Sequence, residues 1–520
     1  MNDPDIDLPP KKKGAAPTKV WGWESTTILL AAGPARAAVR PPMAKPAKGA
    51  KAERRITDWS KSFAAAASYA DWQAVWEAML LEARAFLEGG RDIPESEARQ
   101  IGDAAGKRLW TLAKVKGSLG DETHYRRVVE AEAVISALGE SRKPLQPVSR
   151  DLTAPWDQLT TKILRTLSQI EDSFELAARG ASDISFAAGK SVVKVLMTGF
   201  DPFDPSGSLK APPKGTWNPA GAAVLALDNQ SVPVKSSAGA GGTASVQGIV
   251  LPVDYDKFQA GGKGLVESVV TGGAADLDAA ITVSMDPNLG PTAPVRLERY
   301  VVGTHNVPRT NAQAQTTQKL EPIPPAGGGG AGDEIIESNA PLAKIAADTE
   351  KGKAIPKPDI GETVTLRFAD AATAKKAATA LHGAGSPGSK EVEVSDEKAL
   401  REIINTMVRK PNGIDIAFRA SGANFTATVV SGPGGNFLSN EVSYRMLRLL
   451  KEKKFSQDPL SFHVHTQGAD AIPQDVSTPE AKEKRTSALK AATGLLGRSC
   501  VQRHLRGEAS PKRSQANRQP

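Results

Sequence analysis

The chain has 520 residues, of which 40% are hydrophobic and 24% charged, the composition of a globular protein with two or three compact units. No apolar run reaches the ~18 residues of a membrane span, and the single cysteine, Cys500, excludes an intrachain disulfide or a cysteine-based metal site. The net charge of +8 equals that of residues 481–520, where ten Lys or Arg accompany two acids, so the basic character belongs to a tail and not to a nucleic-acid-binding module.

The first part of the chain is predicted to be disordered and then helical. Residues 1–55 are rich in Pro, Ala and Lys, and their short TTILLAAG run follows Glu24, which argues against a secretory signal and for a cytoplasmic protein. Over residues 56–190 apolar side chains recur with a helical period, as at Trp72 and Trp76. This pattern predicts an all-α helical bundle domain with the Trp and Leu side chains in its core.

Beyond Lys190 the pattern changes to short β-rich runs that alternate with helical runs. Continuous apolar strands separated by helices predict a mainly parallel sheet covered on both faces, which is a three-layer α/β/α domain over residues 191–480. Ligands of such folds bind beyond the carboxyl ends of the strands. Residues 322–411 fit the alternation poorly and are predicted to be an insertion, a small α/β subdomain between flexible linkers. The β-rich runs are VVKVLM, GIVLPV, LDAAITVS, FTATVVSG and FHVH.

The stretch GGNFLSNEVSYRMLRLL, at residues 434–450, carries Ser439 at the start of a predicted helix. Two glycines precede the helix, and its apolar residues recur at helical spacing, so one face is expected to be buried. The pattern alone is also typical of an ordinary serine at a helix N-terminus. A nucleophilic hydrolase needs an attacking side chain, a base and an acid that orients the base, and Ser439, His463 and Glu298 can fill these roles. Structural roles for the same residues stay open at this point, with Glu298 as a surface carboxylate and His463 packed near a strand end.

Five segments in order resemble the pyroglutamyl peptidase I family, also called pyrrolidone-carboxylate peptidases. VLMTGFDPFD, followed by WNP, resembles the opening strand, turn and Asn-Pro-led helix of that family, and VLPVDYDKF resembles its second strand and following helix. LERYVVGTHN resembles the glutamate segment, GGNFLSNEVSYRML the nucleophile segment and SFHVHT the histidine strand. The resemblance covers residues 192–470 with the insertion set aside, and the common order of the five segments makes it specific.

The resemblance implies a cysteine peptidase that removes an N-terminal pyroglutamyl residue without a metal or organic cofactor. Carried over by motif, Glu298 is the orienting acid, His463 is the base, and Ser439 falls where the family has its catalytic cysteine. A thiol is readily ionised beside a helix N-terminus and an imidazolium, whereas an alcohol must lose its proton during the attack itself. A serine enzyme would therefore need an aligned base and backbone amides at the developing oxyanion.

The resemblance also implies residues that bind the substrate. Phe200 and Phe203 match the aromatic pair that packs against the pyrrolidone ring, and Arg309 is matched to an arginine downstream of the glutamate, in a local sequence that has diverged. Further departures are SMDPNLGPTA in place of a glycine-rich segment and His465 in place of the expected proline.

No metal site is predicted. The stretches GAGGTA and AGGGGAG lack the spacing of a phosphate-binding loop and are interpreted as flexible loops. His463 and His465 are expected to point to opposite faces of their strand, and therefore not to form a chelating pair.

Three hypotheses for function remain. The leading one is a hydrolase that acts on a peptide with an N-terminal pyroglutamate or a similar lactam, through an acyl-enzyme on Ser439. The second is a catalytically degenerate family member that serves as a binding or interaction module. In the third, the helical domain docks a protein partner and delivers the α/β domain as cargo.

Overall fold

A mixed but mainly parallel sheet forms the centre of the molecule. The computed structural model describes residues 94–115, most of 169–200 and most of 218–493. Seven strands follow the order β10-β5-β16-β4-β1-β3-β2, and β5–β16 and β2–β3 are the antiparallel neighbours while the other four pairs are parallel. The expected α/β architecture is therefore confirmed. The strands are β1 (Val192–Phe200), β2 (Ser231–Lys235), β3 (Gly241–Leu251), β4 (Ala279–Asp286), β5 (Val295–Glu298), β10 (Asp359–Gly361) and β16 (Leu460–Gln467).

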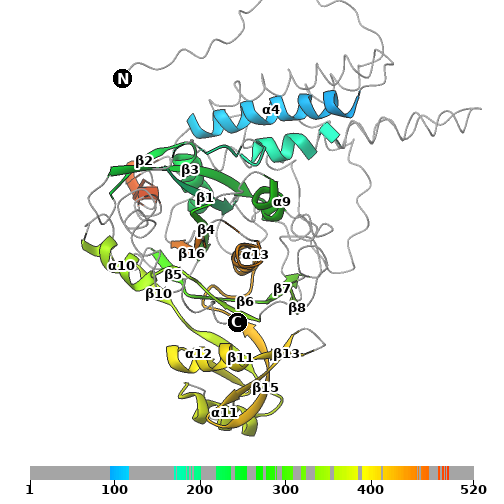
Figure 1. Ribbon diagram of the computed structural model, residues 1–520, viewed down its shortest axis with the longest axis vertical. Helices are drawn as coiled ribbons and strands as arrows, with labels where there is room; N and C mark the ends of the chain where they lie inside the picture. The colour runs from blue at the N-terminus through cyan, green and yellow to red at the C-terminus, as the bar shows by residue number, and fades with distance from the viewer. Residues whose placement is uncertain are drawn as a thin grey trace, which may run out of the picture.

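Helices cover both faces of this sheet, which explains why β1 and β4 are almost continuously buried. One apolar cluster joins the sheet to α7 (Pro219–Leu227) and α10 (Leu342–Lys351), and another joins its opposite face to α9 (Leu265–Gly272) and α13 (Leu438–Glu452). Figure 1 shows α13 end-on beside β4 and β16, with α10 on the other side of the sheet. The start of α7 is fixed locally, because Asn218 accepts a hydrogen bond from the Ala220 amide at 3.0 Å and Pro219 follows it in the first turn.

The described part of the predicted helical domain packs directly on the α/β body. It includes α4 (Glu95–Val115) and a helical stretch at 172–178. Gly106 of α4 allows close approach to that stretch, since an added Cβ would lie 2.6 Å from Ala177 Cβ. Trp110 joins the main core, and its Nε1 donates to Asp228 Oδ2 at 2.9 Å. The rest of the predicted bundle and residues 1–55 lie outside the described residues, and the tail is described only at a few positions up to 493.

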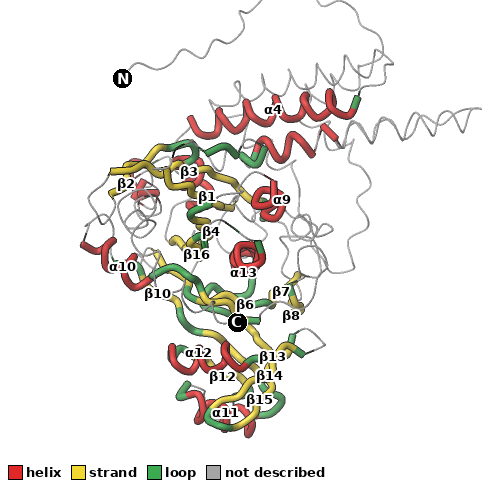
Figure 2. The backbone as a smooth tube through the Cα atoms, in the orientation of Figure 1, coloured by secondary structure: helices red, strands yellow, loops and turns green. Residues whose placement is uncertain are grey.

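A second sheet forms a separate lobe, at the bottom of Figure 1 and of the tube drawing in Figure 2. Its order is β12-β11-β15-β14-β13, with every pairing antiparallel. The strands are β11 (Val364–Arg367), β12 (Glu391–Val394), β13 (Val408–Arg409), β14 (Asp415–Ala420) and β15 (Ala423–Ser431), and they pack on α11 (Ala371–Leu381) and α12 (Glu397–Thr406).

This inserted lobe differs from the predicted insertion in its bounds and in the strands and helices that belong to it. It occupies 364–431 and not 322–411, and β10 and α10 belong to the main body. FTATVVSG, expected in the parallel sheet, lies in β15 of the lobe. The reason is visible in its alternation: Asn424 and Thr426 are exposed while Phe425 and Ala427 are buried, as in a sheet with one solvated face.

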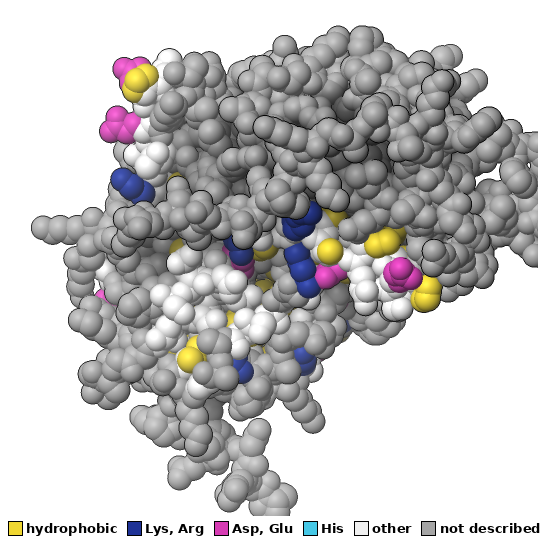
Figure 3. Space-filling model, turned by 90° about the horizontal axis from the view of Figure 1, so that it is seen from above, with side chains coloured by type: hydrophobic (Ala, Val, Ile, Leu, Met, Phe, Trp, Pro, Cys, Tyr) yellow, Lys and Arg dark blue, Asp and Glu magenta, His cyan; other side chains and the backbone are white. Residues whose placement is uncertain are grey.

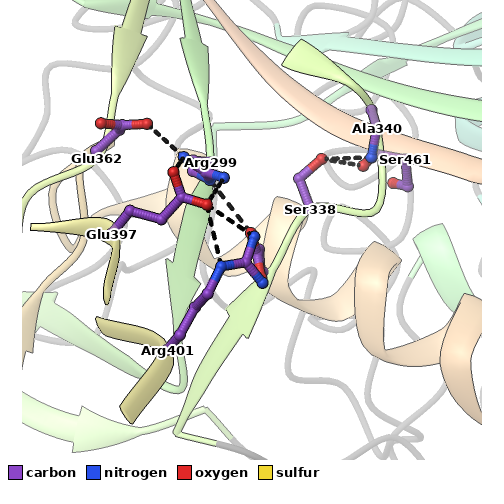
Figure 4. A network of polar contacts seen from close by, with 8 residues as sticks. Arg299, Ser338, Ala340, Glu362, Glu397, Arg401 and Ser461 are labelled. Atoms are coloured by element: carbon purple, nitrogen blue, oxygen red, sulfur yellow. Dashed lines mark hydrogen bonds and ion pairs between the residues drawn. The ribbon is translucent and has the colours of Figure 1, made fainter. Parts of the chain in front are cut away.

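Arg299 fastens the lobe to the main body, as Figure 4 shows. Its guanidinium binds Glu362 at 2.7 Å, Glu397 of α12 at 2.8 Å and Glu337 at 3.2 Å. Arg401 of α12 also binds Glu337, at 3.0 Å. Partial burial would lower the pKa of Arg299, but the hydrogen bonds that its guanidinium donates to Glu362 and Glu397 outweigh this effect and raise the pKa above its ordinary value.

Two short antiparallel pairs lie beside α13: β6 (Tyr300–Val302) with β9 (Ile335–Glu337), and β7 (Thr304–Pro308) with β8 (Gln318–Pro322).

On the face drawn in Figure 3, the described side chains carry charges of both signs. Among the described residues, no helix is both long and apolar enough to cross a membrane.

Candidate functional site

Buried polar side chains form a row across four neighbouring strands of the main sheet. The strand register makes Thr198 of β1, Thr282 of β4, His463 of β16 and Glu298 of β5 successive neighbours. All four are nearly inaccessible to solvent. They share a sheet face with Ala280, whose apolar neighbours include residues of α13. A polar row at such a depth is costly unless its groups pair with one another.

His463, the histidine assigned as base from the motif, is held by two hydroxyl groups. Its Nδ1 lies 2.7 Å from Thr282 Oγ1, and its Nε2 lies 2.7 Å from Ser284 Oγ. Because a hydroxyl can donate or accept, these partners suit either neutral tautomer. Burial, and after it the electrostatic effect that the neighbouring His465 exerts when protonated, holds the pKa of His463 well below its ordinary value of 6.5. His463 is therefore a neutral ring with both nitrogens occupied.

Glu298 pairs with His465, which differs from the expected pairing with His463. The distance between Glu298 Oε1 and His465 Nδ1 is 2.7 Å, and both side chains are buried. Glu298 lies directly opposite His463 in the antiparallel register, but the hydroxyl groups of β4 occupy that ring. Its carboxylate instead reaches the diagonal neighbour, which is within range on one face of an antiparallel pair.

The two histidines lie side by side, with ring centroids 4.5 Å apart. The expectation that they point to opposite faces is wrong, because side chains two residues apart in a strand share a face. Within the described ranges, no group of three or more His, Cys, Asp or Glu side chains is arranged to hold a metal ion.

Ser439 is the second residue of α13 and is partly buried. Its Oγ is 3.4 Å from the Gly434 carbonyl oxygen. The N-cap residue is Phe437, so no side chain at that position caps the helix by a hydrogen bond. Gly434 also faces His465, since a Cβ added at Gly434 would lie 2.8 Å from His465 Cε1. The same glycine thus contacts both side chains, although the described residues show no hydrogen bond between Ser439 and either histidine.

Polar side chains at the start of α13 anchor it to the segment at 302–305. Asn440 donates to the carbonyl oxygens of Val302 and Thr304 and accepts from the Val302 amide, at 2.9, 3.0 and 2.9 Å. The next residue, Glu441, is fully buried and binds His305 at 2.5 Å.

Arg445 completes this buried network one turn further along α13. Its guanidinium donates to Glu441 at 2.8 Å and to Glu267 of α9 at 2.9 Å. Burial opposes ionisation of Glu441, but the hydrogen bond and charge of His305 and the charge of Arg445 outweigh it and lower the pKa of Glu441.

The remaining predicted site residues are only partly described. Phe200 ends β1 as a buried side chain and belongs to the same apolar cluster as Leu438, the residue before Ser439. Phe203 and Arg309 lie outside the described residues. The sequence suggested His465 as a replacement for proline and as a poor chelating partner of His463, but not as a partner of Glu298. The alternation of side chains along a strand was the signal that could have placed it beside Glu298.

The arrangement has the elements of nucleophilic chemistry. When His465 Nδ1–H donates to Glu298, Nε2 is left as a proton acceptor. The N-terminus of α13 directs backbone N–H groups and a partial positive charge toward the segment around Ser439. A histidine, a hydroxyl group and a helix N-terminus therefore belong to one region.

Comparisons with known proteins match parts of this chain. A family model described as the C-terminal domain of PA0049 matches residues 194–353, a segment that includes Glu298 but neither Ser439 nor His465. Two similar solved structures are pyroglutamyl peptidases. A mutant pyrrolidone carboxyl peptidase from Pyrococcus furiosus is 19% identical and covers 58% of this chain and 97% of its own, with a TM-score of 0.30. Pyroglutamyl peptidase I from Bacillus amyloliquefaciens is 16% identical and covers 61% of this chain and 100% of its own, with a TM-score of 0.31.

A third structure has a different chemistry. The 5'-methylthioadenosine/S-adenosyl homocysteine nucleosidase from Campylobacter jejuni is 10% identical and covers 58% of this chain and 96% of its own, with a TM-score of 0.24. No curated protein matches the sequence. At these TM-scores the similarities carry no functional argument, which has to come from the side chains.

Proposed function

We propose that this chain is a serine hydrolase of the pyroglutamyl peptidase type, with His465 and not His463 as its base. The observation that carries the proposal is the buried pair of Glu298 and His465, 2.7 Å apart, against the glycine that precedes the helix of Ser439. His463 is a poorer base because hydroxyl groups occupy both of its nitrogens and its pKa is depressed. A neutral histidine oriented by a carboxylate is the arrangement that activates a serine.

The proposed reaction is an acyl transfer in two steps. Ser439 Oγ attacks the carbonyl carbon of the scissile amide while His465 Nε2 takes its proton, and first-turn amides of α13 stabilise the oxyanion. His465 then gives the proton to the leaving amine. Water, deprotonated by the same histidine, adds to the ester carbonyl, and the intermediate collapses to release the acid and the Ser439 hydroxyl.

The proposed substrate is a peptide with an N-terminal pyroglutamate or a related lactam. This choice rests on the ordered motifs, in which Phe200 and Phe203 match the pair that packs against the lactam ring and Arg309 a downstream arginine. The position of Phe200 on the face covered by α13 agrees with such a use. No cofactor is needed for this reaction.

The test compares the wild type with Ser439→Ala and Ser439→Cys on a pyroglutamyl-fluorophore amide. We expect measurable turnover in the wild type and a loss of on the order of 100-fold or more in Ser439→Ala, because the proposed acyl-enzyme forms on the Ser439 hydroxyl. Trapping of an acyl group on Ser439, located by mass spectrometry, identifies the nucleophile. Unchanged turnover in Ser439→Ala would refute the assignment.

The second candidate is a binding or interaction module that keeps the site without turnover. One observation favours it: the Ser439 hydroxyl contacts the Gly434 carbonyl, at 3.4 Å, and the described residues show no hydrogen bond to a histidine. A site shaped for sulfur would explain that geometry. Activity that appears only in Ser439→Cys would support this candidate.

A further inference from the structure

The Glu298 carboxylate lies against Gly361, a position where any side chain would displace the carboxylate. Gly361 is the last residue of β10 and pairs in register with Glu298. A Cβ added at Gly361 would overlap Glu298 Oε2 and would also lie 2.8 Å from Pro433 Cβ. Gly361 does not have a positive φ, so an alanine there would be strained by space and not by its backbone conformation.

Packing contributes to the orientation of the Glu298 carboxylate, because only one of its two oxygens takes part in a hydrogen bond. Oε1 binds His465, while Oε2 is buried and has no hydrogen-bond partner among the described residues. A buried carboxylate oxygen without a donor is free to rotate unless neighbouring atoms confine it. The surface of Gly361 confines it from the side of β10.

A second glycine approaches the other member of the pair. A Cβ added at Gly434 would lie 2.8 Å from His465 Cε1 and 3.7 Å from Glu298 Cγ. Gly361 immediately precedes the inserted lobe, and Gly434 follows it closely, so the two connections of the lobe enclose the Glu298–His465 pair. Pro433, beside Gly434, completes the contact with Gly361.

We propose that Gly361 and Gly434 are positioning residues, whose close packing keeps the Glu298 carboxylate hydrogen-bonded to His465. This inference rests on the proposed function for its catalytic consequence, but the hydrogen bond it concerns can be measured without any substrate. A methyl group at Gly361 displaces the carboxylate, and His465 loses the acceptor that fixes its tautomer.

The first experiment observes that hydrogen bond directly. An imidazole N–H that donates to a carboxylate gives a low-field proton resonance, which is assigned to His465 by its absence from His465→Gln. We expect the resonance in the wild type and in Gly248→Ala, and its loss or upfield shift in Gly361→Ala. Gly248 is the matched control, because its added Cβ would lie 2.7 Å from Val224 Cγ1, in the sheet but away from the pair. An unchanged resonance in Gly361→Ala, or none in the wild type, would overturn the inference.

A double-mutant cycle keeps the inference testable if Gly361→Ala folds poorly. Removing the carboxylate in Glu298→Ala opens the space that the methyl group needs. The fall in unfolding midpoint caused by Gly361→Ala should therefore be smaller in the Glu298→Ala background than in the wild type. Equal falls in both backgrounds would mean that Gly361 does not act through Glu298.

Labelling of Ser439 by a fluorophosphonate separates this inference from the proposed function. We expect labelling of the wild type and of Gly248→Ala, and a rate lower by on the order of 100-fold in Gly361→Ala, because a misplaced base loses its geometry. No labelling of the wild type would refute the proposed function, while the proton resonance would still decide the role of the glycines. A normal labelling rate in a folded Gly361→Ala would overturn the inference alone.

Discussion

His463 and His465 are two residues apart on β16, yet the sheet surrounds them with different partners. Hydroxyl groups of β4 take both nitrogens of His463, and the carboxylate of β5 takes one nitrogen of His465. A ring between two hydroxyls in a buried setting stays neutral, while a ring beside a carboxylate is oriented for proton transfer. Identical residue types on one strand thus differ in chemistry because of their neighbours.

We predict that His465→Asn and His463→Asn separate the two histidines. His465→Asn should lower kcat/KM on the pyroglutamyl amide by roughly 100- to 10,000-fold, as for loss of a general base. His463→Asn should act mainly on the free energy of unfolding, by about 1–3 kcal/mol, since it leaves buried hydroxyl groups without their partner. Steady-state kinetics and urea unfolding measure the two effects. The reverse order of catalytic losses would restore His463 as the base.

At the scale of the element, α13 owes its position to polar contacts in its first two turns. Asn440 ties the helix to β6 and β7, and Arg445 ties it to α9 through Glu267. The glycine-containing turn before the helix then carries Ser439 in a fixed register relative to β16. An amphipathic pattern alone would allow the helix to slide along the sheet, whereas buried polar pairs do not.

We predict that Arg445→Met destabilises the fold by on the order of 3–5 kcal/mol, because two buried carboxylates lose their shared guanidinium. Arg99→Met is the control, since Arg99 pairs with Glu95 at an exposed position of α4 and should cost less than about 1 kcal/mol. Urea unfolding of both variants measures the difference. Similar losses in the two variants would contradict a special contribution of the buried network.

The same network predicts a pH dependence. The pKa of Glu441 in the folded state lies below its ordinary value of 4.5, so its stabilisation is complete above 4.5 and is lost as the pH falls through the lower folded value. In Arg445→Met one cause of the lowered pKa is absent, so the stabilisation that depends on pH should be smaller and its loss should be complete at a higher pH. Unfolding midpoints over an acidic pH series test this order.

At the scale of the whole molecule, the charge cluster around Arg299 is one of the contacts between the inserted lobe and the main body, and the ion pair of Arg409 with Glu334, at 2.6 Å, is another. Arg299 directly follows Glu298, so the residue that fastens the lobe adjoins the residue that orients His465. Ser338 adds a further link within the main body, donating to the Ser461 carbonyl of β16 at 2.7 Å (Figure 4). The position of the lobe and the geometry of the site therefore share a segment of chain.

We predict that Arg299→Gln loosens the lobe. Three carboxylates, of Glu337, Glu362 and Glu397, would lose a common partner and repel one another. Hydrogen exchange in α12 should become faster, and added salt should reduce the difference from the wild type. Arg367→Gln, which removes an ion pair with Glu391 inside the lobe, should leave this exchange unchanged. Equal exchange in Arg299→Gln and the wild type would show that other contacts hold the lobe.

Local pattern was enough to predict the α/β class and the helix that begins near Ser439. Continuous apolar runs such as β1 arise because both faces of the sheet are covered, and the glycines before α13 mark a turn that only small residues allow. The order of these segments also suggested Glu298 as an orienting acid and Ser439 as a nucleophile, and both assignments remain proposals. These features depend on residues close together in the chain.

Only the tertiary structure decided which histidine receives Glu298 and where the inserted lobe begins and ends. The register of β5 against β16 and the hydroxyl groups of β4 leave His465 as the partner, and these contacts join residues more than 160 positions apart. The lobe was misplaced for a similar reason, because β10 belongs to the main sheet through its pairing with β5. Cross-strand pairing depends on the packing of distant segments, and the local alternation of residues does not encode it.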